Sequence, residues 1–146
     1  MFFDNGLATP SVSINGIGFV AVGSMRPIPI VGVVDDDAAV CHSLKFSLEL
    51  EGFAVRTYGS AAELLNADDL GSCNCFVIDQ NMPAMSGMEL VAKLRERRSL
   101  APAILIISQP NDTLSARATA AKVPIVEKPF FGNALVERIR EACQRG

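Results

Sequence analysis

The chain has 146 residues, of which 49% are hydrophobic and 20% are charged, and its formal net charge at pH 7 is -3. This length suits one domain with a single sizeable core, and the slight acidity excludes the basic surface expected of a protein that binds nucleic acid directly. No stretch approaches the roughly 20 apolar residues of a membrane-spanning helix, and the amino end lacks a basic secretory signal, so we expect a cytoplasmic protein.

Residues 1–28 differ from the rest of the chain, because they carry few charges and do not share its alternation of strands and helices. Asn15 and Gly16 lie between two apolar runs, as the turn of a β-hairpin would. We therefore expect an N-terminal extension with a hairpin, whose apolar side chains pack on the domain or on a second copy of the chain. A start of the biological protein at Met25 is an open alternative.

From residue 29 onward, short apolar runs alternate with helical patterns. The runs predict strands at 30–34, 53–57, 75–79, 103–108 and 124–128. Helices are expected at 38–51, from 60, at 86–98, within 109–123 and at about 133–145. Strands that alternate with helices form parallel sheets through right-handed crossovers, so we expect an α/β domain with a doubly wound, five-stranded parallel sheet and five helices.

Several helix ends carry recognisable capping residues. Ser60 and Ser86 each precede a glutamate by three residues, which is the spacing of a capping box, and Gly52 stands where a glycine ends a helix. Asp37 is expected to cap the first helix. The apolar positions expected to face the core are Val40, Leu44 and Leu48 in the first helix, and Leu135, Val136, Ile139 and Cys143 in the last.

Polar side chains follow four of the five predicted strands. They are Asp35 and Asp36 after the first, Asp79 at the end of the third, Ser108 at the end of the fourth and Lys128 at the end of the fifth. These strand ends converge on one crevice in a doubly wound sheet. Crowded carboxylates repel one another unless a cation neutralises them, and oxygen ligands favour Mg²⁺. A lysine and a hydroxyl beside such an ion suit a phosphoryl group, so Asp79 is expected to be a nucleophile that forms an acyl phosphate.

Other metal chemistry is not supported by the sequence. The four cysteines lack paired C-x-x-C spacing, and His42 is the only histidine, so a zinc site would be short of ligands. We expect reduced, buried thiols instead.

Four motifs together resemble the receiver domain of bacterial two-component response regulators. They are VVDDD (33–37), VIDQNMPAMSGMEL (77–90), ILIIS (104–108) and VEKPF (126–130). The resemblance divides the chain into an extension, 1–28, and a receiver domain, 29–146. It implies a flavodoxin-like sheet in the order 2-1-3-4-5. It also implies that Asp79 is the phosphoacceptor, that Asp36 is the principal Mg²⁺ ligand with Asp35 as its partner, and that Asp79 and the backbone carbonyl of Asn81 also bind the ion.

The resemblance further implies that Ser108 and Lys128 contact the phosphoryl group. Family members usually carry tyrosine or phenylalanine three residues before this lysine, and this chain has Ile125, so the aromatic switch is missing. The segment between Ser108 and Lys128 is also short for the family. We therefore expect the phosphoryl group to act through residues 109–123 or through the first helix and the N-terminal extension.

The function implied by this resemblance is that of a single-domain response regulator and not of an enzyme with its own substrate. A sensor histidine kinase or a phosphotransfer protein would phosphorylate Asp79. Because the chain ends with the last helix, output would pass through protein contacts, a phosphorelay or homodimerisation, with no role for nucleic acid or membranes.

One alternative is a receiver-like binding module that works without phosphorylation. The other is a phosphatase of the haloacid dehalogenase type, with its nucleophile at Asp35 in an Asp-x-Asp motif with Asp37.

Overall fold

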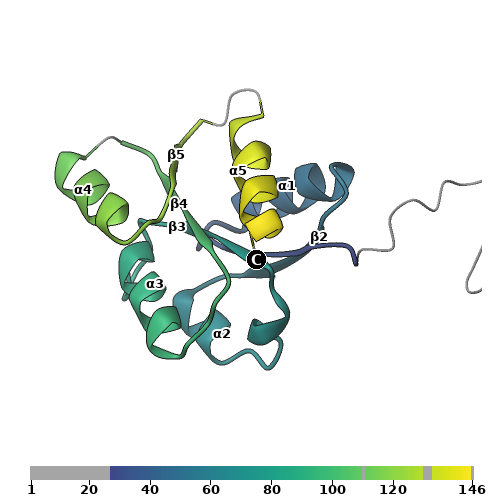
Figure 1. The fold of residues 1–146 in the computed structure, drawn as a ribbon, viewed down its shortest axis with the longest axis horizontal. Helices are drawn as coiled ribbons and strands as arrows, with labels where there is room; N and C mark the ends of the chain where they lie inside the picture. Colours follow the sequence, from purple (N-terminus) through teal and green to yellow (C-terminus); the bar gives the residue numbers. More distant parts are fainter. Residues whose placement is uncertain (1–26, 110, 130–132, 146) are drawn as a thin grey trace, which may run out of the picture.

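A computed structural model describes residues 27–109, 111–129 and 133–145, so the expected N-terminal hairpin lies outside the described residues. Five parallel strands form one sheet in the order β2-β1-β3-β4-β5 (Figure 1). The strands are β1 (Ile30–Val34), β2 (Ala54–Tyr58), β3 (Cys75–Asp79), β4 (Ala103–Ile107) and β5 (Ile125–Glu127). The predicted doubly wound, flavodoxin-like sheet is therefore confirmed.

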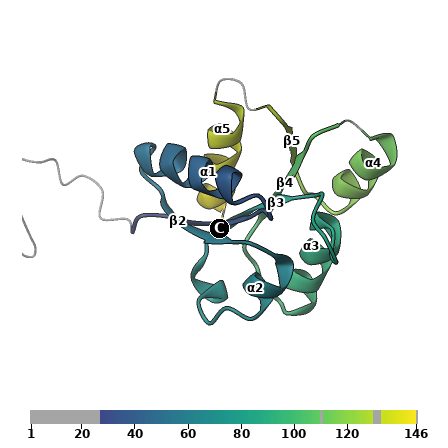
Figure 2. The ribbon, with the colours of Figure 1, turned by 180° about the vertical axis from the view of Figure 1, so that it is seen from behind.

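Five helices cover the two faces of this sheet. They are α1 (Ala38–Leu50), α2 (Ala61–Leu65), α3 (Gly87–Glu96), α4 (Asp112–Ala120) and α5 (Ala134–Arg145), with a short 3₁₀ helix at Leu70–Ser72. Helices α1 and α5 lie on one face, and α2, α3 and α4 lie on the other (Figures 1 and 2). Within the described ranges, none of these helices is long and apolar enough to span a membrane.

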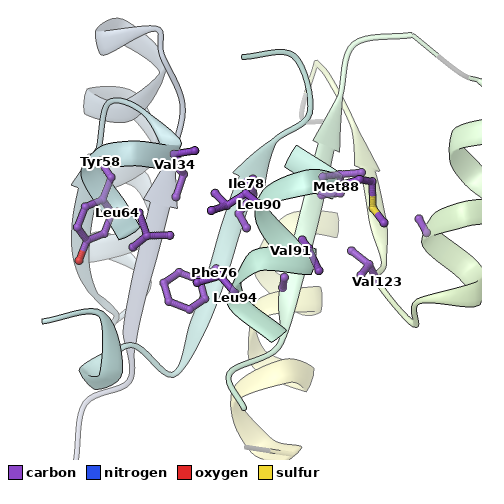
Figure 3. Close-up of a cluster of buried hydrophobic side chains, with 14 of the residues drawn as sticks. Val34, Tyr58, Leu64, Phe76, Ile78, Met88, Leu90, Val91, Leu94 and Val123 are labelled. Carbon is purple, nitrogen blue, oxygen red and sulfur yellow. The ribbon is translucent and has the colours of Figure 1, made fainter. Parts of the chain in front are cut away.

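The strands divide the core into two apolar layers, because successive strand residues point to opposite faces of the sheet. Val33, Val77 and Ile106 belong to the layer under α1 and α5. Phe76 and Ile78 belong to the opposite layer, where Figure 3 shows them with residues of α2 and α3. Strand β3 is buried along its whole length, so its last residue, Asp79, is held at a fixed point at the edge of the core.

Three strands, β2, β4 and β5, have boundaries that differ from the prediction by one residue. Strand β2 starts after Phe53, because the backbone N–H of Phe53 donates to the carbonyl of Leu48 (3.1 Å) and closes the end of α1. Strands β4 and β5 end one residue early, which leaves Ser108 and Lys128 just beyond them. The Lys128 N–H still donates to the Ile107 carbonyl (2.8 Å), so the backbone at Lys128 remains tied to β4.

The buried faces of α1 and α5 differ slightly from the predicted ones. Val40, Val136 and Cys143 are half-buried, and Cys41 and Ala142 are buried. The buried positions therefore follow the spacing Cys41, Leu44 and Leu48 in α1, and Leu135, Ile139 and Ala142 in α5. All four cysteines are free, as predicted, although Cys143 is not fully buried.

The predicted helix caps are present with one change. Ser86 and Glu89 form both bonds of a capping box at α3, and Gly52 follows α1 with φ of 99°. Ser60 accepts a bond from the Glu63 N–H (3.0 Å), but the Glu63 carboxylate accepts from Gly59 instead of Ser60. Helix α3 ends two residues before the predicted position, at Glu96.

Candidate functional site

The backbone after β1 turns Asp35 into the crevice and leaves Asp36 exposed. The Asp35 N–H donates to the Tyr58 carbonyl (3.1 Å), which continues the pairing of β1 with β2 by one residue. The Asp35 Oδ1 atom accepts from the N–H of Asp37 (2.9 Å), and Asp37 caps α1 by accepting from Ala39 N–H (2.9 Å), as predicted. Asp35 is therefore fixed in orientation, with only 2% of its surface exposed.

Asp79 faces the acidic pair from the end of β3. One carboxylate oxygen from each of Asp35, Asp36 and Asp79 lies within 4.8 Å of the others. Burial raises the pKa of Asp79, and the negative charge of Asp35 raises it further. The ammonium of Lys128 and a hydrogen bond from the backbone N–H of Asn81 oppose this pKa shift only in part. The ionised carboxylate of Asp79 is thus held in surroundings that disfavour its charge.

Lys128 supplies the positive charge nearest to the two buried acids. Its Nζ lies 3.5 Å from Asp35 Oδ2 and 3.8 Å from Asp79 Oδ1. These distances allow electrostatic attraction but are too long for good hydrogen bonds. Lys128 therefore bridges the two carboxylates without satisfying either of them.

The oxygen atoms of this cluster fit a divalent cation. Within the described residues, Asp35 Oδ2 and Asp79 Oδ1 are buried and accept no hydrogen bond. A buried carboxylate oxygen without a partner is costly, and hard oxygen ligands are those that Mg²⁺ prefers. The three carboxylates together offer a Mg²⁺ ion the charge and the vacant ligand atoms it needs.

Ser108 and Asn81 line a pocket beside the acidic cluster. The pocket has a volume of about 520 Å³, and its other lining residues are Gln80, Ile107, Gln109, Asn111, Thr113, Leu114 and Arg117. Both Ser108 and Asn81 are exposed. Arg117 was not predicted, because its place at this pocket depends on where α4 starts. The Asn111 side chain sets that start by accepting from the Leu114 N–H (3.0 Å).

Ile125 lies on β5, where sequence reasoning placed the missing aromatic switch. It pairs with Leu105 of β4 and packs at the margin of one core layer. Ile125 is half-buried, because β5 is a three-residue strand at the edge of the sheet.

Gly87 positions Asp79 and was also missed by sequence reasoning. Its N–H donates to the Gln80 carbonyl (3.0 Å), and the Gln80 side chain accepts from the N–H of Met88 (2.9 Å). A Cβ atom at Gly87 would lie 2.7 Å from the Asp79 carbonyl oxygen and 2.6 Å from Leu105 Cδ1. Only glycine lets α3 start this close to the end of β3.

We expect Gly87→Ala to lower the free energy of unfolding by about 1–3 kcal/mol, because a backbone carbonyl cannot move aside as a flexible side chain would. Urea denaturation would measure this change. Gly71→Ala is the matched control, since a Cβ atom there would meet nothing within 4 Å. Equal stability of the two variants would show that the close approach of α3 to β3 is not constrained.

The comparisons with known proteins agree with this geometry. The family model described as "Response regulator receiver domain" matches residues 31–140. The chain belongs to this family. The predicted division at residues 28 and 29 is compatible with that range and stays a prediction.

Two curated relatives and one solved structure illustrate the likeness of this receiver chain to known proteins. The transcriptional regulatory protein FixJ of Azorhizobium caulinodans is 35% identical over 116 residues, which cover 79% of this chain and 55% of FixJ. The response regulator protein TodT of Pseudomonas putida is 31% identical, over 79% of this chain and 51% of TodT. The crystal structure of FixJ-N has a TM-score of 0.74 and 31% identity, and the match covers 83% of this chain and 98% of FixJ-N. The chain thus spans about half the length of the curated relatives it matches.

The haloacid dehalogenase alternative requires Asp35 and Asp37 to act together. Asp37 is exposed and is occupied as the cap of α1, outside the cluster of three carboxylates. The geometry therefore does not support that alternative, in agreement with membership of the receiver family.

Proposed function

We propose that this receiver domain accepts a phosphoryl group on Asp79 from a histidine kinase or a phosphotransfer protein, with Mg²⁺ as cofactor. The observation that carries the proposal is the cluster of three carboxylates within 4.8 Å, with Lys128 Nζ 3.8 Å from Asp79 Oδ1. A buried, hydrogen-bond-free carboxylate oxygen beside a cation is suited to attack an electrophilic phosphorus atom.

In the proposed step, a carboxylate oxygen of Asp79 forms a bond to phosphorus as the bond from phosphorus to the donor breaks. The leaving group, an imidazole nitrogen or a carboxylate oxygen of the donor, keeps the electron pair. Lys128 attracts the oxygens of the arriving phosphoryl group, and the Ser108 hydroxyl donates a hydrogen bond to one of them. A Mg²⁺ ion, held by Asp35, Asp36, Asp79 and the Asn81 carbonyl, would offset the repulsion between phosphoryl group and carboxylates.

The proposal also covers the location of the protein and its partners. We place it in the cytoplasm, as a phosphoacceptor that promotes only its own phosphorylation and hydrolysis. Its phosphorylation would change its affinity for a partner protein or for a second copy. The net charge of -3 supports a protein partner over nucleic acid.

Incubation with acetyl phosphate and Mg²⁺ is expected to add the mass of one phosphoryl group, measured on the intact protein. Removal of Mg²⁺ with a chelator should prevent the addition. Asp36→Ala should lose most of the labelling together with its dependence on Mg²⁺, because the variant lacks one of the three carboxylates that would hold the ion. Asp68→Ala is the control, since Asp68 is an exposed acid outside this cluster. An unchanged mass in folded protein with Mg²⁺ present would rule out the proposed function.

A further inference from the structure

The outer face of α1 exposes large apolar side chains. Within the described residues, Phe46 and Leu50 are 64% and 73% exposed, and Ile28, just before β1, is 65% exposed. Phe46 and Leu50 are four residues apart and therefore share one face of the helix. Leu44 and Leu48, by contrast, are buried against the sheet. Among the described residues, the other large apolar side chain that is strongly exposed is Leu100, which lies between α3 and β4.

The N-terminal segment, residues 1–26, joins the domain beside the C-terminal end of this helix. Pro27 lines the same pocket as Glu51 and Gly52, which directly follow α1. The Pro29 carbonyl accepts a hydrogen bond from the N–H of Ala54, which fixes the chain there (2.9 Å). Figure 2 shows the start of β1 at the same end of the sheet as the C-terminal end of α1. The segment is therefore tethered next to Leu50.

The N-terminal segment is apolar and nearly uncharged, so its side chains can pack against the exposed apolar face of α1. Only Asp4 and Arg26 are charged in residues 1–26. Its longest apolar run, residues 17–22, includes the large apolar side chains Ile17, Phe19, Val20 and Val22. The 13 residues of α1 span roughly 20 Å, whereas 26 extended residues reach roughly 90 Å, so even a segment folded back on itself can cover the helix. The family match begins only at residue 31, which makes this segment an addition to the family domain.

We propose that residues 1–26 dock on the outer face of α1 and cover Phe46 and Leu50. Tethering favours this occupant over a second copy of the chain, because a short linker gives an effective concentration on the order of millimolar. Docking removes apolar surface of both partners from water.

A double-mutant cycle in the full-length chain tests this contact. The face variant carries Phe46→Ser and Leu50→Ser, and the segment variant carries Ile17→Ser, Phe19→Ser and Val20→Ser. Each variant alone is expected to lower the melting temperature, with a shift on the order of 5 °C for the loss of such a contact in a domain of this size. The combined variant should melt no lower than the more destabilised single variant, because the same contact is already lost.

Leu100→Ser is the control, because Leu100 is 94% exposed between α3 and β4. Its effect should simply add to that of the segment variant. The proposal would be overturned by additive effects of the face and segment variants, or by unchanged melting temperatures. A full-length dimer in size-exclusion chromatography that the face variant converts to monomer would also overturn it, since a second copy would then be the occupant. No phosphoryl donor is needed, so this outcome is independent of the proposed function.

Discussion

Asp79→Asn is expected to abolish phosphoryl labelling and to make the Mg²⁺-free protein more stable at neutral pH. The amide nitrogen and oxygen of asparagine cannot replace the carboxylate as nucleophile. The substitution also removes a buried charge that Asp35 repels, while Lys128 keeps Asp35 as a partner at 3.5 Å. We expect the free energy of unfolding to rise by about 1–2 kcal/mol in the presence of a chelator.

The pH dependence of this gain follows from the raised pKa of Asp79 in the folded protein. Below the pKa of the unfolded state, the carboxyl is neutral in both states and the Asn variant has no electrostatic advantage. As pH rises from there through the folded pKa, ionisation costs the folded wild-type protein stability, so the difference grows and then levels off. Urea denaturation over a pH series would measure it. A less stable Asn variant at neutral pH would contradict this description of the site.

Lys128→Ala is expected to have the opposite effect on stability. The variant leaves the buried carboxylates of Asp35 and Asp79 without their nearest cation, because Lys128 Nζ lies within 4 Å of both. Removing one partner of a buried charge cluster is strongly destabilising, and 26% exposure of the lysine side chain moderates the loss to about 1–3 kcal/mol without Mg²⁺. Labelling by acetyl phosphate should slow at least about tenfold, which corresponds to about 1.4 kcal/mol in the barrier.

Two further variants separate this effect from a general loss of a lysine. Lys45→Ala removes only an exposed pair with Glu49 on α1, so its stability should change by less than about 0.5 kcal/mol. In an Asp79→Asn background, Lys128→Ala should cost less than it does in the wild-type chain, because one of the two uncompensated charges is gone. If Lys128→Ala were as stable as Lys45→Ala, the lysine would not compensate the acidic cluster.

The sequence was sufficient to predict the sheet and to predict that the polar residues at the ends of its strands lie close together. The apolar runs are local signals, and the topology of a doubly wound sheet brings Asp35, Asp79 and Lys128 to one edge. The roles of Gly87 and Arg117 could not be predicted in this way. Gly87 is required by the close approach of two elements, and the position of Arg117 depends on the cap of α4, so both are properties of the tertiary packing.

The boundary errors also have tertiary causes. Phe53 is apolar, and the sequence pattern therefore assigned it to the second strand. The structure buries Phe53, but its N–H donates to the Leu48 carbonyl at the end of α1, so it does not join the strand. Isoleucine is a residue type usually found in protein cores, but Ile125 lies on an edge strand and is only half-buried. The burial of a strand side chain therefore depends on whether its strand is central or at the edge of the sheet, and the apolar pattern alone does not predict this.

Ile125 bears directly on how a phosphoryl group would be read out. A side chain branched at Cβ is stiff about χ1, so Ile125 is not expected to act as a switch between two side-chain positions. Signal output through residues 109–123 or through α1 stays a prediction. A binding module that needs no phosphorylation is the alternative, and the presence of three clustered carboxylates with Lys128 argues against it.

The most direct test of the central claim is to locate the phosphoryl group on the chain. The protein would be treated with acetyl phosphate and Mg²⁺ and then with borohydride, which reduces an acyl phosphate to an alcohol and so converts a phosphorylated aspartate to homoserine. Peptide mass mapping is expected to find homoserine at residue 79, and to find none in Asp79→Asn or in chelator-treated protein. Homoserine at another aspartate, or none in folded protein with Mg²⁺ present, would contradict the assignment of Asp79 as phosphoacceptor.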